Sequence, residues 1–66
     1  MNEDEFNMSM RKFLKQVGVT SQQQIETSVR DAAADGKLGT TVRAKMVLTI
    51  EETGLNHVVE GDIKLG

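Results

Sequence analysis

The chain has 66 residues, so we expect a single small domain over residues 1–66 with only a modest apolar core. It contains no cysteine and one histidine, which excludes disulfides, cysteine-ligated zinc, iron–sulfur clusters and a multi-histidine metal site. The net charge is −2, and no apolar run approaches the roughly 20 residues that are needed to cross a bilayer.

Charge is unevenly distributed along the chain. Residues 1–10, 11–45 and 46–66 carry net charges of −3, +4 and −3. An acidic start has the wrong sign for a secretory or mitochondrial targeting segment, so we expect a complete cytoplasmic protein that does not associate with membranes. The basic middle segment is the one candidate interaction surface that charge indicates. Its members are Arg11, Lys12, Lys15, Arg30, Lys37, Arg43 and Lys45.

Residues 3–17 have the spacing of an amphipathic helix, because their apolar side chains recur at intervals of three and four. Asn2 is a suitable N-cap, with Glu5 three residues later as in a capping box. Gly18 is placed to end this helix in a left-handed conformation. The apolar face consists of Phe6, Met10, Phe13, Leu14 and Val17.

A second helix is predicted over residues 21–35, with Thr20 or Ser21 as its cap and Gly36 at its end. Because so few residues lie between the two predicted helices, we expect either an antiparallel pair or the steeper crossing of a helix-turn-helix. The apolar face of this second helix is small. It consists of Ile25, Val29, Ala32 and Ala33.

From residue 41 the apolar period changes to two, which predicts strands over 42–50 and 57–65 on either side of a turn at Gly54. A two-residue turn at positions 53 and 54, or a four-residue loop over 52–55, gives the same antiparallel register. In that register Ile50 lies opposite His57, Leu48 opposite Val59, Met46 opposite Gly61, and Lys45 opposite Asp62.

The predicted fold is therefore α+β with the order ααββ, in which two N-terminal helices pack on one face of a C-terminal β-hairpin. A lone two-stranded hairpin is marginal in water, so the helices must cover its apolar face. Both strand edges stay open in this arrangement. An open edge could pair with a second copy of the chain, and we expect a homodimer of this kind.

Several patterns suggest chemistry without completing it. His57 is a candidate general base, but no motif places Ser9, Ser21, Ser28 or a carboxylate beside it, and a strand-end histidine is the better interpretation. The acidic residues Glu51, Glu52, Glu60 and Asp62 lack the spacing of a calcium loop. The run Gly36–Thr41 lacks the order of a phosphate-binding loop and follows a helix. We therefore predict no catalytic residue, no metal site and no cofactor.

Two further features bear on partners. Among the methionines, Met8 is the one candidate for an exposed apolar contact, because Met10 and Met46 fall on predicted core faces. The segment 13–21 has the look of a helix-turn-helix, and a following hairpin would resemble the wing of a winged helix. Against nucleic-acid binding, the first helix of the usual three-helix core is missing and the pI is about 5.2.

The segments Asn2–Ser9, Arg11–Lys15 and Val17–Gln22 are similar to the opening of a family of very short bacterial proteins of unknown function. Ala44–Met46 and Gly54–Val59 also resemble that family. The resemblance extends over nearly the whole chain and implies a free-standing bacterial protein. The family has no assigned activity, so the resemblance implies no functional residues. The residues themselves favour a non-enzymatic interaction module that self-associates, with a winged-helix-like nucleic-acid-binding protein as the alternative.

Overall fold

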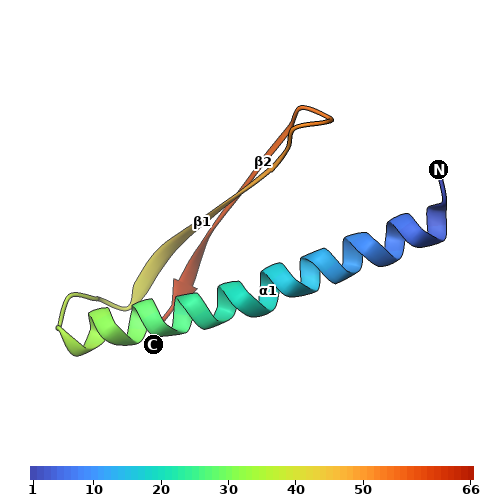
Figure 1. Ribbon diagram of the computed structural model, residues 1–66. Coiled ribbons are helices and arrows are strands. Elements are labelled where there is room, and N and C mark those ends of the chain that lie inside the picture. The colour runs from blue at the N-terminus through green and yellow to red at the C-terminus, as the bar shows by residue number, and fades with distance from the viewer. The chain divides into compact units, whose positions relative to one another are not determined.

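The computed structural model describes residues 1–66 and contains one α-helix followed by one antiparallel β-hairpin (Figure 1). The helix α1 spans Glu3–Ala34, and the strands β1 and β2 span Thr41–Ile50 and Leu55–Lys64. The α+β class is confirmed. The expected order of two helices and two strands is wrong, because a single helix occupies the whole region before the hairpin.

The first compact unit, residues 1–36, consists of α1 and its two ends. Asn2 Oδ1 accepts a hydrogen bond from the Glu5 backbone N–H at 3.1 Å, so the predicted N-cap is confirmed. Glu3, Asp4 and Glu5 occupy the first turn, where their negative charges face the positive end of the helix dipole. The sequence therefore fixes the start of α1 through local signals alone.

The helix continues through Gly18, where the sequence predicted a break. Positive φ angles occur only at Gly36, Gly54 and Gly66, so Gly18 does not adopt the left-handed conformation that would end a helix. The hydroxyl of Thr20 donates to the Gln16 carbonyl at 2.8 Å within the helix, and does not cap a new one. A glycine inside a helix costs about 1 kcal/mol relative to alanine, which a helix of 32 residues tolerates.

The apolar pattern explains why the helix is continuous. From Val17 the stripe proceeds to Ser21, Ile25 and Val29 in steps of four, so the two predicted apolar faces lie in phase. A turn at residues 18–20 would break that alignment. The side chains of this part of the stripe are half-buried, and so is that of Ala32. Gly18 and the possible caps at Thr20 and Ser21 are local signals for a break in the helix. The uninterrupted phase of the apolar stripe outweighs these signals.

The C-terminal end of α1 agrees with the sequence. The helix ends at Ala34, and Gly36 follows with a φ of 69°. The Gly36 backbone N–H donates to the Ala33 carbonyl at 3.0 Å. Glycine is favoured here because a side chain would strain the left-handed conformation. The chain then enters β1 at Thr41.

The second compact unit, residues 37–66, is the hairpin, in which β1 and β2 pair antiparallel along their full length. Alternate side chains fall on opposite faces, as the period of two predicted. One face, here called the apolar face, holds one histidine among aliphatic residues and a glycine. Its members are Val42, Ala44, Met46, Leu48 and Ile50 from β1, and Leu55, His57, Val59, Gly61 and Ile63 from β2.

The register differs from the expected one by two residues. Leu48 lies opposite His57, not Val59, and Ile50 lies opposite Leu55. A shift of two keeps every side chain on its predicted face, so the face assignment stands although the individual pairs were wrong.

The connecting loop explains the shift. It has four residues, 51–54, of which Gly54 alone has a positive φ, at 73°. A two-residue hairpin turn at 53 and 54 of the favoured mirror-image type would require a positive φ at Thr53, which a β-branched residue avoids. In the four-residue loop the Thr53 hydroxyl instead accepts a hydrogen bond from the Leu55 N–H at 3.3 Å.

No residue of the chain is buried, and the accessible surface is 5930 Å². A single helix cannot cover its own apolar face, and neither can a hairpin of two strands. Each unit therefore has well-formed secondary structure, and each keeps large apolar side chains in contact with water.

Candidate interaction surfaces

The predicted basic surface is divided between the two units. Arg11, Lys12, Lys15 and Arg30 lie on α1, Lys37 lies in the connection after the helix, and Arg43 and Lys45 lie on β1. Within each unit these residues have different electrostatic neighbours. Their joint role as one interaction surface stays a prediction.

Three of the helical cations form a basic segment, defined here as Arg11, Lys12 and Lys15. All three are exposed. Residues three and four positions apart are neighbours on a helix surface, and no acidic residue has that spacing from any of them. At a spacing of three or four residues, the charged neighbours of each member are other members of the basic segment. The positive charge here is therefore not offset within α1, in contrast to Arg30, which has Glu26 four positions before it.

The cations of β1 are matched by acids across the hairpin. Arg43 lies opposite Asp62, and its Nη1 is 3.1 Å from Asp62 Oδ1. Lys45 lies opposite Glu60. The sequence had paired Lys45 with Asp62 and Arg43 with Lys64, and the two-residue shift of register places Glu60 opposite Lys45 and Asp62 opposite Arg43. The outer face of the hairpin is thus close to neutral.

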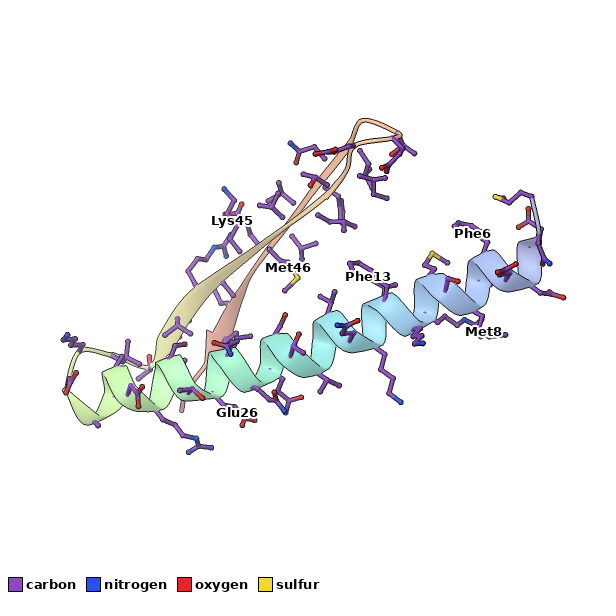
Figure 2. All side chains as sticks on the ribbon, in the orientation of Figure 1. Phe6, Met8, Phe13, Glu26, Lys45 and Met46 are labelled. Atoms are coloured by element: carbon purple, nitrogen blue, oxygen red, sulfur yellow. The ribbon has the colours of Figure 1, made fainter.

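An exposed apolar surface on α1 was missed by the sequence interpretation, which assigned these side chains to a core. It consists of four residues on one face of the N-terminal half of the helix, here called the helix patch. Figure 2 shows Phe6 and Phe13 on one side of α1 and Met8 and Glu26 on the other. The exposed fractions in the helix patch are 47% for Phe6, 42% for Met10, 50% for Phe13 and 52% for Leu14.

Met8 is 70% exposed and lies away from the helix patch, so the sequence correctly identified it as an exposed methionine. Met10 and Met46 are also exposed, at 42% and 44%, where a core position had been expected for both. Both lie on the apolar faces that the sequence identified. Those faces were predicted correctly, but the single chain does not cover them.

The apolar face of the hairpin is exposed in part. Figure 2 shows Met46 and Lys45 on opposite faces of β1. Val42, Ala44, Leu48 and Ile63 on this face are half-buried. The exposed large apolar side chains of this face are Met46, Ile50, Leu55 and Val59.

The candidate catalytic and metal-binding residues do not converge. Within the hairpin, His57 shares its face only with aliphatic residues and a glycine, and its cross-strand neighbour is Leu48. The hydroxyl of Ser28 donates to the Ile25 carbonyl on α1 at 3.1 Å. Glu51 and Glu52 lie in the hairpin loop. No three acidic or histidine side chains form a group that could hold a metal ion.

The helix-turn-helix interpretation required two helices separated near Gly18. Residues 13–21 are instead uninterrupted α-helix, so the chain has neither the turn nor a separate recognition helix. The winged-helix alternative loses the element on which it was based. A hairpin alone does not indicate a wing.

The chain belongs to a family of unknown function, DUF6494, whose family model matches residues 1–66. This membership confirms the predicted resemblance to a family of unknown function. No curated protein and no solved structure matches the chain. No helix combines the length and the apolar character that crossing a membrane would require.

Proposed function

We propose that this protein is a non-enzymatic interaction module that works as a homodimer, in which a second copy covers apolar surface that the single chain exposes. One observation carries the proposal: none of the 66 residues is buried, although both units have continuous apolar faces. Burial of apolar surface is the main favourable term in folding, at roughly 25 cal/mol per Å². A chain with no buried residue obtains little of this term by itself.

The composition leaves few other sources of stability. Chains of this size often add disulfides, a bound metal or another subunit, and the absence of cysteine removes the first. A second subunit needs no additional chemistry. The same apolar faces that a larger protein would cover with its own elements are available to a second copy.

The hairpin supplies one route to a dimer. Both β1 and β2 are ten-residue edge strands, and an open edge can accept another strand. If two β1 strands pair antiparallel about Met46, Lys45 faces Val47 and Arg43 faces Thr49 of the second copy, so no like charges oppose. This sheet-edge dimer, which the sequence suggested, belongs to the proposal.

The non-enzymatic part of the proposal is supported by the surroundings of His57. General base catalysis needs a histidine within hydrogen-bond reach of a proton donor and oriented by another polar group. On its face of the hairpin, His57 has only apolar neighbours. We propose a cytoplasmic role in which binding to another protein surface, not chemistry, is the activity.

Thermal unfolding at different protein concentrations tests self-association directly. Far-UV circular dichroism at about 5 µM and about 500 µM should show a midpoint that rises with concentration, because a dimer is favoured by mass action. A cooperative transition with the same midpoint at both concentrations would contradict the proposal.

A further inference from the structure

We propose that the side of α1 away from the helix patch binds a short acidic segment of another protein. This inference rests on the proposed role as an interaction module and adds the chemistry of the partner. It does not depend on the second copy, because a copy that covers the helix patch leaves the other side of α1 open. The surface, here called the basic face, joins the basic segment with two apolar residues. Its members are Met8, Arg11, Lys12, Lys15 and Val19.

The five residues of the basic face lie on one side of the helix. At 3.6 residues per turn, their side chains fall within an arc of roughly 100° around the axis of α1. Figure 2 shows Met8 on the side of α1 away from Phe6 and Phe13, which belong to the helix patch. From Met8 to Val19 the face is roughly 16 Å long, at about 1.5 Å per residue. A partner helix of about a dozen residues therefore spans it.

The charge of the basic face is not balanced by the rest of the helix. Residues 6–25 contain three cations and no acidic residue, so this stretch has a net charge of +3. None of the three cations forms an ion pair within the chain. Lys15 lies four residues after Arg11 and three after Lys12, and like charges at these spacings destabilise a helix. An acidic partner offsets this repulsion and is attracted by all three cations.

Two apolar side chains lie at the ends of the basic face. Met8 is 70% exposed and Val19 is 50% exposed, and both lie outside the apolar stripe of α1. Met8 precedes Lys12 by four residues and Val19 follows Lys15 by four, so the cations occupy the helical turns between them. The unbranched side chain of methionine adapts to irregular apolar partners. The complementary partner therefore carries apolar side chains on either side of its acids.

Acids beyond the two ends of the basic face favour a protein segment over a continuous polyanion. Asp4 and Glu5 lie three and four residues before Met8, and Glu26 lies seven residues after Val19. A nucleic-acid strand or an anionic bilayer that extended past the face would meet these acids, and the net charge of −2 on the whole chain adds to the repulsion. A protein segment avoids this repulsion, because its acids can be confined to the residues that meet the cations.

Binding of a designed peptide to the full-length chain tests the inference. The probe is a fluorescein-labelled helical peptide that repeats the spacing of the basic face and has uncharged ends. It carries glutamate in place of each cation and leucine in place of Met8 and Val19. Fluorescence anisotropy at about 50 mM salt should show saturable binding in the micromolar range. The same peptide with glutamine in place of each glutamate should bind about tenfold more weakly, because it loses three charge pairs.

Two double variants with the same loss of charge locate the contact. Lys12→Gln combined with Lys15→Gln should weaken binding of the probe by about fivefold or more. Lys45→Gln combined with Lys64→Gln removes two charges from the hairpin instead, and should change the affinity by less than about twofold. Circular dichroism of each variant should show the helix content of the natural chain.

A single substitution tests the apolar part of the basic face. Met8→Gln keeps the length of the side chain and removes its apolar character, so it should weaken binding of the probe by about threefold. An unchanged affinity would show that charge alone attracts the probe, and would overturn the proposed apolar complementarity.

The remaining outcomes separate this inference from the proposed function. Equal binding of the acidic and neutral peptides would overturn the inference, as would equal effects of the two double variants or no saturation by the probe at about 1 mM. Tighter binding of a single-stranded oligonucleotide or of phosphatidylserine vesicles would also overturn it, because the partner would then be a continuous polyanion. In all these cases self-association survives. Sedimentation of the natural chain as a monomer at all concentrations would instead overturn the proposed homodimer, while saturable binding of the probe would still support the basic face.

Discussion

The helix and the hairpin both expose apolar faces, but they differ in how they balance their charges. On the hairpin, Arg43 and Asp62 form an ion pair at 3.1 Å, and Lys45 faces Glu60. On α1 the basic segment has no acidic neighbour at helical spacing. The hairpin thus balances its outer face internally, whereas α1 presents uncompensated charge on the side away from its exposed apolar patch.

This difference indicates which unit has unsatisfied interactions that a partner could complete. An apolar patch alone is not specific, because any apolar surface can cover it. The cations of the basic segment lie on the side of α1 away from the helix patch, so they add no direction to it. Substitutions in the helix patch and on the apolar face of the hairpin therefore decide which of the two a second copy covers.

The largest expected effect comes from placing a charge in the helix patch. Phe13→Asp should raise the dimer dissociation constant on the order of 100-fold, because each chain loses about 1–1.5 kcal/mol of apolar burial. Val59→Asp is a control of similar exposure on the hairpin, at 56% against 50%. It should change the constant less than tenfold. Sedimentation equilibrium measures both, and equal effects would remove the distinction between the two units.

Gly54→Ala should destabilise the hairpin by about 1–2 kcal/mol, because alanine strains the left-handed conformation that Gly54 adopts at a φ of 73°. The thermal midpoint at fixed concentration reports the loss. An unchanged midpoint would mean that the loop does not require a positive φ at this position, and the explanation of the register through the loop would then lose its basis.

Gly18→Ala should have the opposite effect on stability. Nothing lies within 4 Å of the position where the new Cβ would stand, and Gly18 has helical backbone. Alanine should therefore stabilise α1 by about 1 kcal/mol and increase its helix content. Far-UV circular dichroism measures both changes. Destabilisation would instead indicate a left-handed Gly18, and with it the turn between two helices that the sequence first suggested.

Asn2→Ala should cost about 1 kcal/mol by removing the side chain that accepts from the Glu5 N–H. Hydrogen exchange at the first turn of α1 should accelerate while that of the hairpin stays constant. Faster exchange in both units to the same degree would show that they unfold together, and that the two cannot be treated separately.

The smallest effect is expected from the hairpin ion pair. Arg43→Ala should cost about 0.2–0.5 kcal/mol, because both side chains are more than half exposed and the pair is screened by solvent. A double-mutant cycle with Asp62→Ala isolates the coupling from other effects of each change. A coupling well above 1 kcal/mol would mean that the outer face of the hairpin is covered, and so takes part in the dimer contact.

How much of the fold the sequence predicts depends on the length scale of each signal. The cap at Asn2 and the end of α1 at Gly36 depend on nearby residues and were predicted correctly. Gly18 looked like a stop, and only the phase of the stripe from Val17 to Val29 shows that the helix continues. That phase is visible in the sequence, so this error could have been avoided.

The register of the hairpin could not be derived from its pattern. Alternation of period two is unchanged by a shift of two residues, so it assigns faces and leaves the pairs open. The conformation of Thr53 decides between the loops. The same limit applies to the candidate surfaces. The cations were identified from the sequence, but whether an acid balances Arg43 depends on the register, and the exposure of Phe13 depends on the extent of packing.

Sedimentation equilibrium of the natural chain over the micromolar range tests the central claim most directly, because it reports mass without any substitution. The account predicts a mass that rises with concentration from that of the 7.3 kDa chain towards twice that value. A constant mass of one chain at every concentration, for a protein that remains folded by circular dichroism, would contradict it.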